Sequence, residues 1–256
     1  MKQINFVLKK MGLVCAREKT VRMLDKEMSV YDAIWSRYLQ PIFYIDADMM
    51  TDMFAMSFDK DNPYTRSLTE HIEKPDTEYE SSALCRFYEI FQPSSVDDVF
   101  LSGNGITTDK SDGLFSYQLP WDIVPKTNNG HKMNYSGPMD IKRGKAEYER
   151  LIDVYDSIKK QGYMIRKSEN LFNSNNIQGY FLKNNDEYSF IVLHGKHRAA
   201  SLIALGEKKI PVTFDLGYQR VIDRAAVEDW PLVKKGQMSK EKALMIFDAF
   251  FNRIGE

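Results

Sequence analysis

One segment reads Tyr188-Ser-Phe-Ile-Val-Leu-His-Gly-Lys-His-Arg-Ala-Ala-Ser-Leu-Ile-Ala-Leu-Gly-Glu-Lys-Lys-Ile-Pro-Val-Thr-Phe214. Its first apolar run, residues 190–193, has the β-branched and aromatic side chains of a buried strand. Apolar residues then recur at helical spacing from 199 to 205, and Gly206 stands where a helix commonly ends. A second short apolar run covers 210–214. The order predicts a strand, a tight turn, a helix and another strand.

The turn in this segment, residues 194–198, has the features of an anion site. A helix that begins after Gly195 directs unpaired N–H groups and a partial positive charge at whatever lies before it. Gly195 lacks a Cβ, so a ligand can approach the backbone closely. Arg198 has a planar fork that matches phosphate or carboxylate, and Lys196 and His197 add donors. The alternative is an ordinary strand–helix turn with solvated basic residues.

An amphipathic helix is predicted upstream, from Lys145 to about Gln161. Its polar residues at spacings of three and four share one stripe, and they are Glu147, Arg150, Asp153 and Ser157. A surface ion pair between Glu147 and Arg150 is the alternative explanation of that stripe. Residues 177–182 and 188–193 are then expected to form a β-hairpin.

Together these motifs resemble one protein superfamily. Gly195-Lys-His-Arg-Ala-Ala, Leu205-Gly and Ile210-Pro-Val resemble the core motif of ParB/sulfiredoxin-like proteins, and the helix that ends at Gly162 resembles the helix preceding it. The resemblance spans roughly residues 137–214. It implies an α+β fold, with a ParB/sulfiredoxin-like domain of a small mixed sheet and helices at 137–256. A mainly helical region, 1–136, would precede it and supply an acceptor site or lid, with the boundary at Gly137-Pro138.

The resemblance also implies roles for individual residues. In this superfamily the G-x-x-R turn holds nucleotide phosphates, which here assigns Gly195, Lys196, His197 and Arg198 to phosphate binding. The preceding helix would bring Arg150, Asp153 and Ser157 near the phosphates or their magnesium ion, with Asp153 as a metal ligand. Kinase members use an acidic residue as base, and the candidates are Glu147 and Asp153. His197 is a further catalytic candidate.

The function implied by the resemblance is nucleotide-dependent phosphoryl transfer to the hydroxyl of a small molecule or glycan precursor. ATP or ADP would serve as donor with Mg²⁺, and CTP is the other nucleotide considered. Residues 230–236 and the helix after them resemble the tail of ParB-like proteins from bacterial surface-polysaccharide clusters, which suggests a role in polysaccharide biosynthesis. The alternative is a ParB-like nucleotide switch that binds DNA or a partner without catalysis.

Other activities fit the sequence less well. A ParB-like DNA-binding protein would have a helix-turn-helix after the core and a basic stripe, and we find neither in the sequence. Sulfiredoxin chemistry needs a cysteine where this chain has Lys196, and a nuclease needs a carboxylate cluster that we do not find. A structural or regulatory subunit that keeps only the fold remains an alternative.

The least regular segment, residues 102–135, contains four glycines, and a loop of this length is usually functional. Within it Trp121 and Asp122 are candidate substrate contacts, together with His194, although simple packing would also explain Trp121. Elsewhere we expect helices at 20–39, 66–74, 81–91 and 237–253, and a strand at 41–48.

Composition limits the remaining choices. The 256 residues are 43% hydrophobic and 28% charged, as in ordinary globular proteins, and the net charge of −1 argues against a protein dominated by nucleic-acid binding. The apolar runs are too short to cross a bilayer. The N-terminal segment faintly resembles a signal peptide, but Lys9 and Lys10 interrupt its apolar run, so we do not expect a signal peptide. Two distant cysteines, Cys15 and Cys85, suggest reduced thiols and a cytoplasmic location.

Overall fold

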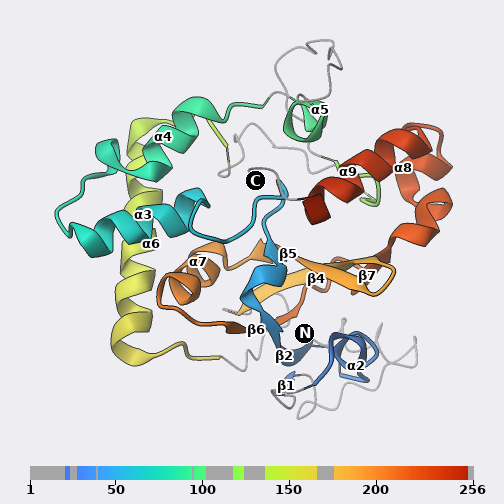
Figure 1. Ribbon diagram of the computed structural model, residues 1–256, viewed down its shortest axis with the longest axis horizontal. Coiled ribbons are helices and arrows are strands. Elements are labelled where there is room, and N and C mark those ends of the chain that lie inside the picture. Colours follow the sequence, from blue (N-terminus) through green and yellow to red (C-terminus); the bar gives the residue numbers. More distant parts are fainter. Residues whose placement is uncertain are drawn as a thin grey trace, which may run out of the picture.

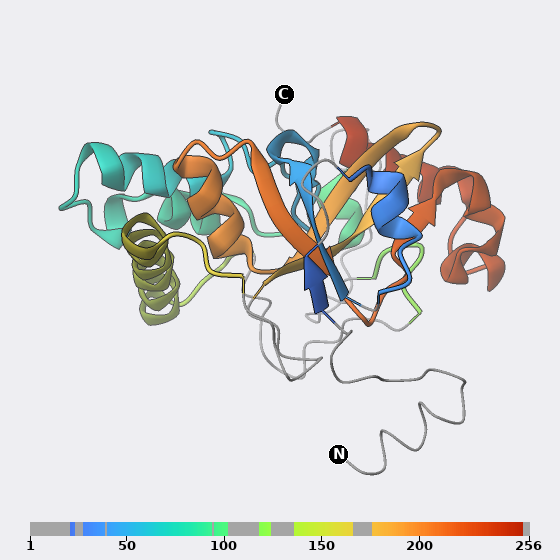
Figure 2. The same cartoon turned by 90° about the horizontal axis from the view of Figure 1, so that it is seen from below.

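The computed structural model describes residues 21–23, 28–38, 40–93, 95–101, 118–123, 136–165 and 176–252. They form an α+β fold with one mixed, open sheet. Figures 1 and 2 show the sheet in the middle, with α3, α4, α6 and α7 on one side and α8 and α9 on the other. No helix in this described part is both long enough and apolar enough to cross a membrane.

The sheet combines strands from both ends of the chain. The strands are β1 (Val21–Met23), β2 (Gln40–Asp46), β3 (Met50–Thr51), β4 (Ile177–Asn184), β5 (Glu187–His194), β6 (Lys209–Phe214) and β7 (Val221–Asp223). Their order in the sheet is β1-β2-β6-β4-β5-β3. β4 pairs with β6 through residues 177–179 and with β7 through residues 181–183. β4 and β5 form an antiparallel hairpin in which Phe181 is opposite Phe190. β2 runs antiparallel to β6, and β3 runs parallel to β5.

The helices are mostly short. They are α2 (Val30–Ile34), η1 (Ala47–Met49), α3 (Pro63–Glu73), η2 (Tyr79–Ser81), α4 (Ala83–Ile90), α5 (Val96–Phe100), α6 (Ile141–Gln161), α7 (Lys196–Ala204), η4 (Arg224–Asp229), α8 (Pro231–Lys234) and α9 (Lys240–Asn252). A Ser, Asn or Asp side chain caps the start of α2, α3, α4, α5 and α6. α6 starts four residues before the predicted position because the side chain of Asp140 accepts hydrogen bonds from the backbone N–H groups of Lys142 and Arg143.

Each face of the sheet has its own hydrophobic core, because successive strand residues point to opposite faces. Phe181 and Phe190 face the core shared with α3, α4, α6 and α7. Tyr180, Leu182 and Ile191 face the core shared with α5, η4 and α9. The first core therefore fixes the turn before α7 against α6, where the candidate site lies.

The structure confirms the predicted strand–turn–helix–strand order as β5, α7 and β6, and the predicted hairpin as β4 and β5. The predicted helix at 20–39 is wrong. Residues 21–23 pair with β2 as a parallel strand, and of the described residues in this span only 30–34 are helical. Ser29 starts that short helix by accepting a hydrogen bond from the N–H of Asp32. Of the apolar side chains in and just after this helix, Ile34 is buried, whereas Trp35 is 70% exposed.

The region before Gly137 is not only helical. It contains α2 to α5 together with β1, β2 and β3, and β2 and β3 pair with β6 and β5 from the region after Gly137. The two proposed regions therefore share one sheet. Most of the predicted lid segment, residues 102–117 and 124–135, lies outside the described residues.

Candidate phosphate-binding site

The turn before α7 depends on the backbone of Gly195. This residue has φ 89°, in the left-handed region that glycine adopts without strain. A Cβ at this position would lie 3.0 Å from Cα of Ile177, in β4. The close approach that requires glycine is thus to the neighbouring strand, and it holds the N-terminus of α7 against the sheet.

A hollow of about 180 Å³ lies at this N-terminus. It brings together residues that the sequence singled out on two separate segments. Its walls are formed by Glu147, Arg150 and Val154 of α6, by Leu193 and His194 at the end of β5, and by Gly195, Lys196, His197 and Arg198. Polar residues of α6 and the donor residues of the turn therefore line one pocket, which we call the first hollow.

Glu147 connects α6 to α7 inside the first hollow. Its Oε1 lies 2.7 Å from Nζ of Lys196, and the two side chains are 12% and 15% exposed. The same oxygen lies 3.1 Å from Nε2 of His197, although this contact lacks the alignment of a hydrogen bond and leaves the buried Nε2 without a hydrogen-bond partner among the described residues. Glu147 is thus paired with Lys196, and not with Arg150 on the surface.

Burial and the neighbouring charges shift the pKa values of Glu147 and Lys196 in opposite directions. Burial alone would raise the pKa of Glu147, but His197 and Lys196 outweigh it and lower the pKa to about 2. Burial lowers the pKa of Lys196 to about 8, against the opposing effect of Glu147. Burial also lowers the pKa of His197. Glu147 is therefore ionised at neutral pH and is a weak proton acceptor.

Two tyrosines that the sequence did not suggest complete the surroundings of Lys196. Its Nζ donates a hydrogen bond to the hydroxyl of Tyr64 and lies 4.4 Å from the centre of that ring. The hydroxyl of Tyr64 lies 3.0 Å from that of Tyr88. Tyr88 had only the apolar spacing of the predicted helix at 81–91 as a signal, which does not distinguish it from other core aromatics. Tyr64 precedes the predicted helix at 66–74 and had no such signal.

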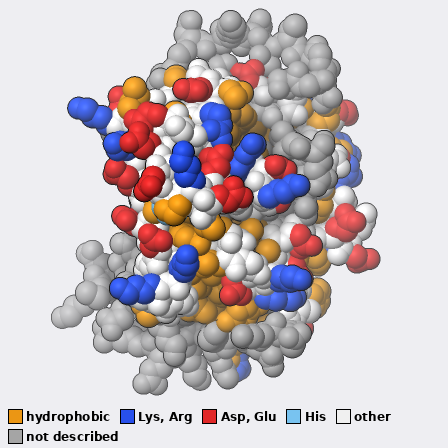
Figure 3. Space-filling view, turned by 60° about the vertical axis from the view of Figure 1, so that its left-hand side comes forward, with side chains coloured by type: hydrophobic (Ala, Val, Ile, Leu, Met, Phe, Trp, Pro, Cys, Tyr) orange, Lys and Arg blue, Asp and Glu red, His pale blue; other side chains and the backbone are white. Residues whose placement is uncertain are grey.

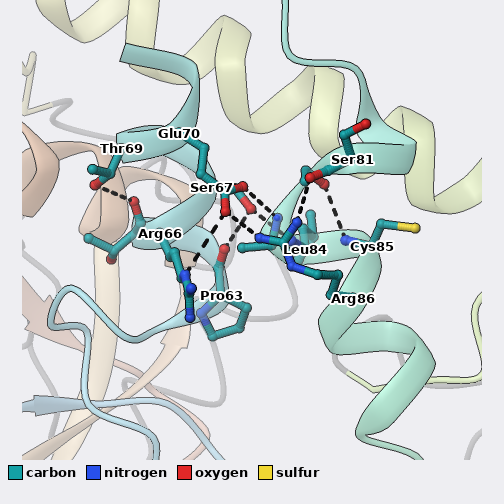
Figure 4. Close-up of polar contacts among 12 residues, drawn as sticks. Pro63, Arg66, Ser67, Thr69, Glu70, Ser81, Leu84, Cys85 and Arg86 are labelled. Atoms are coloured by element: carbon teal, nitrogen blue, oxygen red, sulfur yellow. Dashed lines mark hydrogen bonds and ion pairs between the residues drawn. The ribbon is translucent and has the colours of Figure 1, made fainter. Parts of the chain in front are cut away.

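Contacts between α3 and α4 position these tyrosines (Figure 4). Ser67 donates to the carbonyl of Pro63 at 2.7 Å and accepts from the N–H of Leu84 at 2.8 Å. Glu70 accepts from the N–H of Ala83 at 2.7 Å and forms an ion pair with Arg86. The first turn of α4 is therefore fixed on α3, which keeps the two hydroxyl groups together.

Asp52 is a third residue that sequence reasoning missed. It follows β3, and its Oδ1 accepts from the N–H groups of Phe54 and Met56 at 2.8 and 3.0 Å. Burial raises the pKa of Asp52 to about 7, against the lowering effect of these donors and of the charge on Lys196. Asp52 is thus a carboxyl group that titrates near neutral pH within electrostatic reach of Lys196.

A second hollow, of about 290 Å³, lies further along α6. Its lining consists of Arg150, Asp153, Val154, Ser157, Ile158, Gln161, Gly162, Tyr163, Met164 and Arg198. Asp153 and Ser157 are exposed, and they line this hollow and not the first. Among the described residues, no group of three or more His, Cys, Asp or Glu side chains is arranged to hold a metal ion.

The three candidate substrate contacts lie in different places. His194 is exposed on the wall of the first hollow, with its Nε2 3.4 Å from Oδ2 of Asp215. Trp121 and Asp122 are 4% and 3% exposed and line neither hollow. Trp121 donates to the hydroxyl of Tyr180 at 2.9 Å and packs edge-on against Trp230 in the second core. Packing therefore accounts for Trp121.

Acidic and basic side chains are interspersed on the face shown in Figure 3, which does not form an extended surface of one sign. Comparisons with protein-family models, with curated proteins and with solved structures found no match for the chain.

Proposed function

We propose that the chain binds the phosphates of a nucleotide in the first hollow and transfers a phosphoryl group to a hydroxyl of a small molecule or glycan precursor. The observation that carries this proposal is the composition of the hollow. Arg150, Lys196 and Arg198 converge there at the N-terminus of α7, and Glu147 is the only acid among the described residues that line the hollow. This charge balance and the partial positive charge at the N-terminus of the helix favour a ligand with several negative charges.

The ParB/sulfiredoxin-like fold is part of the proposal. It is supported by the order β5, α7 and β6, by the left-handed Gly195 at the turn, and by the position of α6 beside that turn. Phosphoryl transfer depends mainly on positioning and on stabilisation of charge, which are what such a hollow can supply. Magnesium would arrive with the nucleotide, since it keeps several water ligands and is commonly bound through substrate phosphates.

The geometry changes the role we propose for Glu147. A carboxylate with a pKa near 2, shared between Lys196 and His197, is a poor base for a hydroxyl proton. We assign Glu147 to holding Lys196 in the hollow. Asp153 remains a candidate base or metal ligand from the sequence, but its position in the second hollow favours a different role.

A direct test of transfer uses ³¹P NMR of Mg·ATP and Mg·ADP incubated with the protein and a panel of amino-acid, polyol and sugar hydroxyls. We expect a new phosphomonoester signal that requires both the protein and one acceptor, and its loss in Arg198→Ala. Nucleotide binding without transfer to any acceptor would instead support the ParB-like switch. Failure to bind any nucleotide would contradict both.

A further inference from the structure

The two hollows adjoin each other along α6. They share three lining residues, Arg150 and Val154 of α6 and Arg198 of α7. A ligand long enough to occupy both hollows would pass the two arginines. Since these guanidinium groups lie at the junction, the part of the ligand between the hollows should be anionic as well.

The chemistry of the second hollow differs from that of the first. It contains hydrogen-bonding groups of both kinds, from Asp153, Ser157 and Gln161. The remaining lining includes apolar surface from Ile158 and Met164, and Met164 is 56% exposed. A ligand part that suits this hollow is neutral, flat or partly apolar, and has hydroxyl and amide-like groups at its edge.

Tyr163 gives the second hollow a fixed wall. Its hydroxyl accepts a hydrogen bond from the N–H of Ile177 at 3.3 Å, which ties the residue to the start of β4. The charge of Arg198 acts on Tyr163, so this wall lies close to the junction between the hollows. A rigid aromatic beside exposed methionine provides a surface on which a planar ring can pack.

We propose that the second hollow binds the nucleoside part of the nucleotide whose phosphates occupy the first. The Asp153 carboxylate accepts hydrogen bonds from the ribose hydroxyls, Gln161 pairs with the edge of the base, and Ile158, Tyr163 and Met164 pack on the base. This inference rests on the proposed nucleotide binding. It assigns Asp153 and Ser157 to binding of the nucleoside, and not to binding of the phosphates or the metal ion.

The test compares four ligands by calorimetry on the full chain at one pH and salt concentration: ADP, 2′-deoxy-ADP, 3′-deoxy-ADP and inorganic pyrophosphate. The variants are Ser157→Trp, which fills the second hollow from an exposed helix position, and Asp153→Asn. Asp156→Asn is the matched control, because Asp156 is exposed on the opposite side of α6 from Val154.

We expect the wild type to bind ADP at least about tenfold more tightly than pyrophosphate. Ser157→Trp should weaken ADP to nearly the affinity of pyrophosphate and leave pyrophosphate unchanged. Asp153→Asn should weaken ADP by about tenfold and reduce the preference for ADP over the two deoxy analogues, while Asp156→Asn should behave as wild type.

The outcomes separate this inference from the one it rests on. If pyrophosphate binds but ADP gains nothing over it, or if Ser157→Trp weakens both ligands equally, the first hollow is an anion site and the nucleoside assignment is wrong. If neither ligand binds to the wild type, the proposed nucleotide binding fails and the nucleoside site fails with it.

Discussion

Lys196 and Glu147 form an ion pair that joins α7 to α6, with Nζ and Oε1 2.7 Å apart and both side chains largely buried. The pair is reinforced by Tyr64, whose hydroxyl accepts a hydrogen bond from the same Nζ. Because Lys196 follows the left-handed Gly195 directly, this contact fixes the side chain at the N-terminus of the helix. The position of the Lys196 charge in the first hollow therefore depends on Glu147 of α6 and on Tyr64 of α3.

The first prediction concerns removal of the acid from this pair. Glu147→Gln leaves a largely buried ammonium group without its counter-ion, and we expect the free energy of unfolding to fall by about 2–3 kcal/mol. Urea denaturation measures the change. Glu149→Gln, an exposed position on the same helix, should change stability by no more than about 0.5 kcal/mol. Equal effects of the two substitutions would contradict the structural role of Glu147.

The pH dependence of stability follows from the same carboxylate. The pKa of Glu147 falls from an ordinary 4.5 to about 2 on folding. Its stabilising contribution is therefore complete above pH 4.5 and is lost as the pH falls toward 2. Unfolding measured between pH 2 and 5 should show a smaller slope in Glu147→Gln than in the wild type, and identical slopes would contradict the lowered pKa.

The second prediction concerns nucleotide affinity and pH. Lys196 donates a hydrogen bond to Tyr64 and lies within electrostatic reach of Asp52, Glu147 and Arg150, and burial lowers its pKa to about 8. A phosphate ligand favours the charged amine, so binding should take up a proton near pH 8 and affinity should fall as the pH rises through 8. Calorimetry in two buffers with different ionisation enthalpies measures this uptake. Lys196→Arg should bind without it, and the same uptake in that variant would contradict the assignment.

The third prediction tests Tyr64. In Tyr64→Phe, Lys196 loses a hydrogen-bond acceptor and Tyr88 loses its hydroxyl neighbour, so stability should fall by about 1–2 kcal/mol. The charged amine is then less well supported, and the pH at which nucleotide affinity declines should move downward. A packing role alone would lower stability and leave that pH unchanged.

The fourth prediction separates backbone strain from close packing. Gly195 and Gly206 have φ 89° and 84°, but an added Cβ would meet β4 only at Gly195, and nothing lies within 4 Å at Gly206. Gly206→Ala should therefore lower the free energy of unfolding by about 1 kcal/mol, from the left-handed conformation alone. Gly195→Ala should lower it by about 2 kcal/mol or more. Equal losses would contradict the close approach to Ile177.

Local pattern predicted the part of the fold that carries the first hollow. The apolar runs around Gly195 and Gly206 predict β5, α7 and β6, and the polar stripe of α6 predicts that Glu147 and Arg150 face one side. These features depend on residues that are close to one another in the sequence, so local spacing is enough to predict them.

The rest of the site depends on packing between distant segments. Tyr64 reaches Lys196 across 132 residues of sequence, and it precedes the predicted helix at 66–74, so no local spacing pointed to it. β1 is three residues long and is defined by its pairing with β2, so helical spacing at 20–39 misled the prediction. Trp121 was chosen for its irregular surroundings, and the second core accounts for it instead.

The most direct test of nucleotide binding in the first hollow is calorimetric titration of Mg·ATP, Mg·ADP and Mg·CTP into the wild type and Arg198→Ala. Lys145→Ala is the control, since it removes one positive charge from the exposed side of α6 opposite Val154. We expect at least one nucleotide to bind the wild type and Lys145→Ala equally, and to bind Arg198→Ala at least about tenfold more weakly. Unchanged affinity in Arg198→Ala, or no binding to the wild type, would contradict the assignment of this turn to nucleotide phosphates.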